Sequence, residues 1–336
     1  MLHIIESALN NRKFRVILSN SSSGLHPIFS GVPQGGVLSP LLFTLYVNDL
    51  SSVLTSSKSL LQYADDVKLI TSGTDLKASL RNLYTEFIQL KLWCNTWGLQ
   101  LNPQKSKICV FSNKSMPIFQ TNRLPYFVDL NIPMVDSVKD LGVILDRKLT
   151  FHQHIKLLNN RLRFILSYFW RNLGPLKGSR AIKPIFFAYA QSLIDYALPI
   201  WGTASDTAIK PIIATHKRLL KFVLGIHAFD HNFTYAELAK RASIPTIPSR
   251  YLYLSSSIFY NIVNTNPIND ILTFSIAVPV RRNRSTHFFH IPYKRLTISH
   301  KFFTITINKF FNSLPNDFDF FTQNKASFMG NIKKYI

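Results

Sequence analysis

The chain has 336 residues, of which 46% are hydrophobic and only 17% are charged, and this composition favours a globular chain over an intrinsically disordered one. Its only cysteines, Cys94 and Cys109, exclude a disulfide framework or a cysteine-rich zinc knuckle within these residues. The formal net charge is +22, which favours binding to phosphates, although a solvated basic surface or an acidic membrane surface would also accommodate it.

The first 50 residues indicate short elements separated by a glycine-rich loop. Residues 2–9 are typical of a helix, and residues 14–18 predict a strand. Gly31 to Gly36 predict a loop. Residues 38–50 predict a buried helix entered through Pro40, because the N–H that proline lacks has no partner in the first turn.

Two adjacent carboxylates, Asp65 and Asp66, lie between apolar runs and predict the tip of a β-hairpin. Tight hairpin turns favour Asn-Gly or Asp-Gly, and neighbouring negative charges repel each other. Residues that are unfavourable for the local fold often occur at functional sites. Here a divalent cation bound by both carboxylates would relieve their repulsion, so the pair indicates a metal site. A solvated acidic turn is the alternative.

The rest of the first half predicts one long helix and several strands. Apolar residues from Leu76 to Trp97 recur at gaps of four and three, and Gly98 ends this pattern. Residues 108–111, 132–135 and 143–145 predict strands. The fold class expected is α+β, an antiparallel sheet covered by helices on one face.

The second half predicts helices over residues 155–169, 182–196 and 209–224, of which the first and the third carry several Lys and Arg residues. Residues 1–150 hold 15 Lys and Arg against 10 Asp and Glu, whereas residues 151–336 hold 24 against 7. No uninterrupted apolar run of 18 residues predicts a transmembrane span, and the N-terminus does not resemble a secretory signal. The expected domains are residues 1–150, a basic helical domain over 151–240 and a basic C-terminal segment over 241–336.

Several segments, in the same order, resemble the reverse transcriptases of non-long-terminal-repeat retrotransposons, and among them the jockey-like group. The matching segments are Gly31–Phe43 with Asn48–Asp49, Tyr63–Asp66, Gly98–Pro103 with Lys105–Lys107, Val138–Val143 with Leu145–Asp146, Leu149–Phe151 with His154–Ile155, and Asn312–Pro315. The resemblance implies a partial polymerase palm over residues 1–150 followed by a mainly helical, thumb-like domain. It also implies an RNA template and a DNA primer as partners.

For the chemistry, the resemblance implies that Asp65 and Asp66 are catalytic ligands of Mg²⁺, the cofactor of nucleotide addition. Lys105 matches the family lysine near the phosphates of the nucleotide, where an ammonium can neutralise or protonate the leaving pyrophosphate. A surface lysine is the alternative. The implied activity is that of a nucleotidyltransferase, an RNA-directed DNA polymerase.

For binding, the resemblance implies that Pro33, Gln34 and Gly35 contact the incoming nucleotide and the template base. Glycine allows the close approach of backbone, and Gln34 offers a directional amide. Leu141 and Gly142 match the hairpin that grips the primer end. An ordinary turn is the alternative in both places.

The sequence also departs from the family. Gly36 stands where serine is usual, and Tyr63 stands where phenylalanine is more frequent. No aspartate precedes Asp49, although the family places a third catalytic aspartate on a strand before the glycine-rich loop. Glu6 falls on the helix that follows that strand. We therefore expect the chain to begin downstream of that aspartate, without fingers or endonuclease, and to be inactive alone unless the N-terminal part of the polymerase is supplied.

Three hypotheses follow. In the first, the chain is a portion of a reverse transcriptase. In the second, it is a non-catalytic nucleic-acid-binding remnant, which the surplus of 17 positive charges in residues 151–336 suggests. In the third, it is a product without a stable fold. The expected location is intracellular, either nuclear or cytoplasmic, without membrane association.

Overall fold

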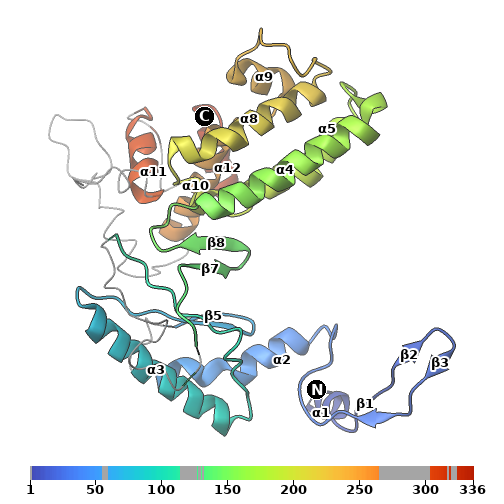
Figure 1. Cartoon of the computed structure of the whole chain (residues 1–336), viewed down its shortest axis with the longest axis vertical. Helices are drawn as coiled ribbons and strands as arrows, with labels where there is room; N and C mark the ends of the chain where they lie inside the picture. Colours follow the sequence, from blue (N-terminus) through green and yellow to red (C-terminus); the bar gives the residue numbers. More distant parts are fainter. Residues whose placement is uncertain are drawn as a thin grey trace. The chain divides into compact units, whose positions relative to one another are not determined.

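The computed structural model describes residues 2–54, 60–113, 127, 130, 132–264, 303–315, 318 and 324–336. The chain divides into two compact units: unit 1 is Met1–Ile108 with Pro117–Met134, and unit 2 is Cys109–Met116 with Val135–Ile336. Both combine helices with short antiparallel strand pairs, so the predicted α+β class is confirmed (Figure 1). The boundary expected near residue 150 remains a prediction. No helix in the described part of the chain is long and apolar enough to cross a membrane.

Unit 1 consists of short elements around one long helix. In chain order they are α1 (Leu2–Leu9), β1 (Lys13–Phe14), β2 (Ile17–Leu18), β3 (Ser21–Ser22), β4 (His26–Pro27), α2 (Ser39–Tyr46), the 3₁₀ helix η1 (Asn48–Val53), β5 (Leu60–Tyr63), β6 (Asp66–Leu69) and α3 (Leu76–Thr96). The strands form three antiparallel pairs, β1–β4, β2–β3 and β5–β6.

The long helix predicted from residue 76 is confirmed as α3. Its N-cap is Asp75, whose carboxylate accepts a hydrogen bond of 2.9 Å from the backbone N–H of Lys77. After the helix, Gly98 adopts a φ of +68°, a conformation that glycine takes without steric cost.

Other predictions for residues 14–50 and 108–135 were wrong. The strands expected at 108–111 and 132–135 reduce to one parallel bridge between Ile108 and Met134, next to Pro133, which has no N–H to extend a ladder. The helix expected over 38–50 is split into α2 and η1 and is largely exposed, with only Ser39, Val47 and Leu50 buried. The strand expected over 14–18 breaks into β1 and β2. The described strands form separate pairs rather than one sheet.

Unit 2 is mainly helical. Its elements are β7 (Ser137–Asp140), β8 (Val143–Asp146), α4 (His152–Asn172), the 3₁₀ helix η4 (Gly174–Leu176), α5 (Ile182–Phe186), the π-helical turn η5 (Phe187–Gln191), α6 (Ser192–Asp195), α7 (Leu198–Trp201), α8 (Asp206–Val223), α9 (Tyr235–Ala242), α10 (Ile247–Asn264), α11 (Phe303–Asn312) and α12 (Lys325–Ile332). The three helices predicted in this half are confirmed, the second as the run from α5 to α6.

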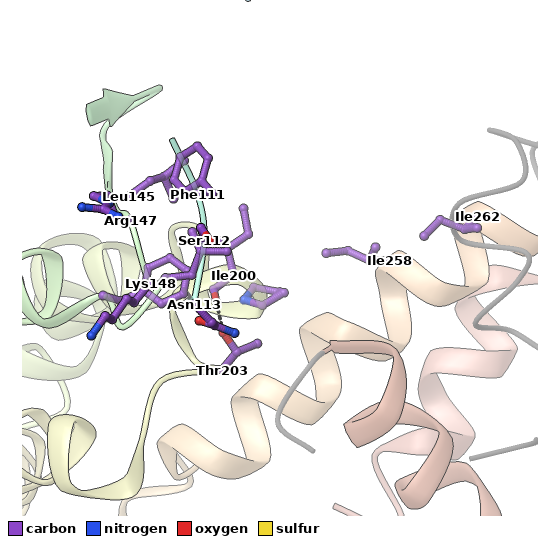
Figure 2. Close-up of a pocket in the computed structure, with 13 residues that line it drawn as sticks. Phe111, Ser112, Asn113, Leu145, Arg147, Lys148, Ile200, Thr203, Ile258 and Ile262 are labelled. Carbon is purple, nitrogen blue, oxygen red and sulfur yellow. Dashed lines mark hydrogen bonds between the residues drawn. The ribbon is translucent and has the colours of Figure 1, made fainter. Parts of the chain in front are cut away.

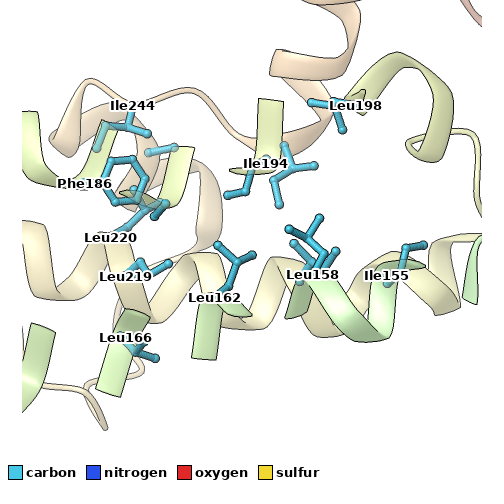
Figure 3. Close-up of a cluster of buried hydrophobic side chains, with 14 of the residues drawn as sticks. Ile155, Leu158, Leu162, Leu166, Phe186, Ile194, Leu198, Leu219, Leu220 and Ile244 are labelled. Atoms are coloured by element: carbon cyan, nitrogen blue, oxygen red, sulfur yellow. The ribbon is translucent and has the colours of Figure 1, made fainter. Parts of the chain in front are cut away.

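The core of unit 2 forms where α4 and α8 pack side by side. Ile155, Leu158, Leu162 and Leu166 follow one face of α4 at helical spacing, and all are buried. Figure 3 shows these side chains in a row, facing the residues contributed by α6 to α8, such as Ile194, Leu198 and Leu219. This continuous apolar core gives unit 2 a stable helical framework of its own.

Candidate active site and basic helical face

The hairpin β5–β6 presents the two adjacent carboxylates at its tip, as predicted. Tyr63 pairs with Asp66, which leaves Ala64 and Asp65 as a two-residue turn. Ala64 has a φ of +51°, and its carbonyl accepts a 3.1 Å hydrogen bond from the Gln62 side chain. Asp65 and Asp66 are both exposed, so their oxygens are accessible to a ligand.

The two carboxylates supply the oxygen atoms that Mg²⁺ prefers, but they are too few to complete its coordination. Magnesium prefers hard oxygen ligands in an octahedral arrangement and retains several waters. Among the described residues, no group of three or more His, Cys, Asp or Glu is placed to hold a metal ion. Asp65 and Asp66 therefore suit an ion that would complete its coordination with water, phosphate or another carboxylate.

The glycine-rich loop is fixed at both ends. At its start, the Arg12 guanidinium donates hydrogen bonds to the carbonyls of Ser30, at 3.0 Å, and of Gly31. At its end, the buried Ser39 hydroxyl donates to the Pro33 carbonyl at 2.5 Å. Between these anchors Gln34 and Gly35 form an exposed turn, so they are free to meet a ligand.

Gly36 packs tightly against the same anchor. A Cβ atom at this position would lie 2.6 Å from the Ser39 Oγ atom and 3.2 Å from the Pro33 carbonyl oxygen. A serine here would therefore require the Ser39 side chain to move, and this explains how the glycine and the Ser39 anchor fit together.

Lys105 lies on an exposed turn after α3. The Asn102 side-chain oxygen accepts hydrogen bonds from the backbone N–H groups of Gln104, at 3.1 Å, and of Lys105, at 3.2 Å. This Asx turn fixes the backbone while the Lys105 side chain remains exposed.

A small apolar core joins the three segments that carry these candidates. Its buried centre is Val47, Leu50, Leu90, Trp93 and Cys94. Against it pack Phe43 from the helix after the glycine-rich loop, Leu60, Val67 and Leu69 from the carboxylate hairpin, and Leu99 and Leu101 from the segment before Lys105. The sequence segments predicted to act together are thus physically connected within unit 1, although the described residues form no hydrogen bond or ion pair between the candidate side chains themselves.

The predicted primer-binding residues form the turn of the hairpin β7–β8 in unit 2. Asp140 pairs with Val143, and the two turn residues, Leu141 and Gly142, have φ values of +41° and +86°. Left-handed values at both central positions are typical of the turns that fit the twist of a hairpin. Leu141 is 40% exposed, so the tip of the turn is accessible.

Asp146 is a structural residue whose role the sequence analysis missed. Its carboxylate accepts hydrogen bonds from the backbone N–H groups of Lys148, Thr150 and Phe151 and from the Thr150 hydroxyl, at 2.7 to 3.2 Å. Partial burial raises the pKa of Asp146, but the hydrogen bonds from Thr150 and Phe151 outweigh it, and the pKa falls below its ordinary value. The signal was present in the sequence, because an Asp followed by Thr at the fourth position is suited to capping a turn.

His154 lies in the first turn of α4, where it is buried against β8. Its Nδ1 atom accepts a hydrogen bond of 3.4 Å from the backbone N–H of Ile144. Burial, with a smaller effect of Arg161, lowers the pKa of His154. The neutral imidazole therefore has a packing role.

The outer face of α4 and α8 combines positive charge with aromatic rings. The helices are joined by a 2.7 Å hydrogen bond from the Thr215 hydroxyl to the Asn159 side chain. The exposed cations of these two helices, together called the basic helical face, are Lys156, Arg161, Arg163 and Arg171 on α4 and Lys210 and Arg218 on α8. Phe164 and Tyr168 lie among them, 68% and 48% exposed. The sequence of α4 contains no acidic residue, so the face suits phosphates and stacked bases.

Unit 2 also contains a mainly apolar cavity of about 720 Å³. Its wall includes Phe111, Leu145, Ile200 and Ile258, with Arg147 and Lys148 beside them (Figure 2). None of the predicted site residues lines it, so the cavity is separate from the candidate chemistry.

Comparison with known proteins identifies similar sequences along most of the chain. Residues 2–145 match the family model of the reverse transcriptase (RNA-dependent DNA polymerase). The "Probable RNA-directed DNA polymerase from transposon X-element" of Drosophila melanogaster is 31% identical over 249 residues, which cover 72% of this chain and 27% of that protein. The RNA-directed DNA polymerase from mobile element jockey of the same organism is 27% identical over 233 residues, covering 66% and 25%. The chain thus spans about a quarter of the length of these curated relatives.

Proposed function

The chain belongs to the reverse transcriptases of non-long-terminal-repeat retrotransposons, and from this premise we propose that residues 1–150 supply part of the polymerase palm and residues 151–336 a nucleic-acid-binding thumb and C-terminal segment. The whole reaction would be RNA-directed DNA synthesis, in which the 3′ hydroxyl of a DNA primer attacks the α-phosphate of a nucleotide and pyrophosphate leaves.

One observation carries the catalytic part of the proposal: the small core around Trp93 joins the carboxylate hairpin, the glycine-rich loop and the Lys105 segment. Asp65 and Asp66 would hold Mg²⁺, which when bound stabilises charge on the attacking and leaving oxygens. Gln34 and Gly35, on their exposed turn, would contact the nucleotide and the template base. Lys105, whose ammonium is on an exposed turn, would neutralise the leaving pyrophosphate.

The proposed site requires a further carboxylate. Residues 1–48 contain no aspartate, and Glu6 lies on α1, where its side chain is 67% exposed and 3.6 Å from His3. Catalytic groups that act as a unit fail together, so two carboxylates without the third should give almost no catalysis. In this proposal the third carboxylate comes from additional polypeptide of the same kind of polymerase.

A primer-extension assay tests this requirement. With an RNA template, a DNA primer, nucleotides and Mg²⁺ or Mn²⁺, residues 1–336 alone should extend no primer. Addition of a polypeptide that carries the missing aspartate should restore extension, and the Asp65→Asn variant should abolish the restored activity. Extension by the 336 residues alone that disappears in Asp65→Asn would contradict the proposal and would mean that another carboxylate completes the site.

A second candidate function, a non-catalytic nucleic-acid-binding protein, is favoured by the basic helical face. Phosphate contacts predict an affinity that falls steeply with salt and ignores sequence. Replacing Arg163 or Arg218 with alanine should lower the salt slope by about one unit each. Lys240→Ala, on α9, is the matched control and should leave the slope unchanged.

The two functions differ in one measurement. Binding with a steep salt slope, but no restored extension with added polypeptide, would favour the non-catalytic function. A flat salt response, or no binding at low salt, would contradict both.

A further inference from the structure

The turn at Leu141 and Gly142 has an unusual backbone for its sequence. Leu141 adopts a φ of +41°, although an L-residue with a large side chain rarely takes a left-handed conformation. Such a conformation persists only where surrounding groups hold it. Leu141 is 40% exposed, so burial of its own side chain is not sufficient to hold it.

Tyr196, 55 residues further along the chain, supplies this support. Its hydroxyl donates a hydrogen bond to the Leu141 carbonyl. Its ring lies against Gly142: a Cβ atom built on that glycine would be 3.4 Å from the Tyr196 Cε1 atom and 3.6 Å from its hydroxyl oxygen. Tyr196 therefore contacts both central residues of the turn.

The backbone of Tyr196 is itself fixed by the helical core. Its carbonyl accepts a 3.0 Å hydrogen bond from the indole N–H of Trp201, a side chain that is completely buried. Its N–H donates to the Ser192 carbonyl at 3.1 Å, and the next residue, Ala197, adopts a φ of +53° that begins α7. The contact thus connects the Leu141–Gly142 turn to the rigid interior of unit 2.

We propose that Tyr196 is a positioning residue for the primer-binding turn, which holds Leu141 and Gly142 in the geometry that receives the 3′ end of a primer. This inference rests on the proposed function of the turn. Tyr196 does not touch the primer. It acts through the Leu141 carbonyl. Because Tyr196 is 55% exposed, its hydroxyl can be removed without opening the core.

The test compares two DNA duplexes of equal length in an anisotropy titration of the 336-residue chain, one blunt and one with a recessed 3′ end. The parent should bind the recessed end more tightly. Tyr196→Phe, which keeps the ring and removes only the hydroxyl, should reduce this preference about fivefold, the effect of one hydrogen bond. Affinity for the blunt duplex should remain that of the parent, and the melting temperature should fall by no more than about a few degrees, the effect of one lost hydrogen bond. Tyr189→Phe, at a tyrosine that is 63% exposed, is the matched control and should keep the preference.

The outcomes separate this inference from the function on which it rests. A parent that binds both duplexes equally would overturn the primer-binding role of the turn and the inference with it. A parent preference that survives in Tyr196→Phe would overturn the inference alone. An equal loss on both duplexes with a lower melting temperature would show a purely structural hydroxyl and would also overturn it.

Discussion

Residues 3–46 and the helices of residues 152–264 differ in how they bury apolar side chains. In the first region Ser39 is the only buried residue, and Phe29 and Val37 are 90% and 95% exposed. In the second, Leu162, Phe186, Ile194 and Trp201 are completely buried. The helical region therefore contains its own source of stability, whereas the region that includes the glycine-rich loop depends on few tertiary contacts.

The difference has a local cause in the length of the elements. The strands β1 to β4 have two residues each, and an isolated pair of that length buries little surface. The helices α4 and α8 have 21 and 18 residues, so each presents several turns of apolar face to its neighbour. Large exposed apolar surface of the kind seen in residues 3–46 is typical of a region that another polypeptide covers.

The first prediction contrasts one leucine from each region and has the largest expected effect. Leu162→Ala should lower the free energy of unfolding by about 2–5 kcal/mol, because it leaves a cavity where the side chain is completely buried. Leu45→Ala should change it by less than about 0.5 kcal/mol, because Leu45 is 63% exposed. Chemical denaturation of both variants provides the measurement. A broad, non-cooperative transition of the parent would support the hypothesis that the chain has no stable fold. An equal loss of unfolding free energy in the two variants would mean that the side chain of Leu45 is covered in solution.

The second prediction concerns a buried histidine of the helical region. The Tyr235 hydroxyl accepts a 2.8 Å hydrogen bond from the backbone N–H of Ile247 and also forms a 2.7 Å hydrogen bond with the Nδ1 atom of His216. His216 is completely buried, and burial lowers its pKa to about 4, an effect that Asp195 partly opposes. The folded protein therefore holds a neutral imidazole that the unfolded chain protonates near pH 6.5.

Because the unfolded state binds more protons below pH 6.5, the contribution of His216 to stability is fully present above that pH and is lost as the pH falls toward 4. The expected loss is about 3 kcal/mol over this range. Denaturation at pH 7.0 and 4.5 measures it. His216→Asn should flatten the pH dependence, and His152→Asn, at an exposed position, should leave it unchanged. A parent whose stability does not vary between these pH values would contradict the burial of a neutral imidazole.

The same contrast explains what could be predicted from the sequence. The helical pattern from Leu76 to Trp97 is local and repeated, so the sequence alone located α3, and two apolar runs around Asp65 located the carboxylate hairpin. The expected strand at 132–135 failed because pairing depends on a distant partner and on Pro133, which donates no hydrogen bond. The prediction that α2 is buried failed for a similar reason, because a sequence shows which residues are apolar but not which other residues cover them.

The candidate site shows the same division between local and distant information. The turns that carry Asp65, Gln34 and Lys105 were recognisable from short motifs. The core that joins their segments, and the contact of Tyr196 with Leu141, link residues far apart in the chain, and no local pattern specifies them.

The last prediction has the smallest expected effect and concerns the carboxylate hairpin. Asp65 and Asp66 are exposed neighbours with like charges, and among the described residues no third acidic, histidine or cysteine ligand joins them. Binding of Mg²⁺ should therefore be weak, and 10 mM Mg²⁺ should stabilise the parent by less than about 1 kcal/mol relative to a chelator. Asp65→Asn should remove this stabilisation by Mg²⁺. In the chelator, its free energy of unfolding should stay within about 0.5 kcal/mol of the parent, because the substitution relieves the repulsion between the two carboxylates.

Asp75→Asn, which keeps a good N-cap on α3, is the control and should retain the response to Mg²⁺. An equal response to Mg²⁺ in the parent and in Asp65→Asn would place the ion elsewhere on the chain, since a site formed by two carboxylates cannot lose one of them without losing affinity.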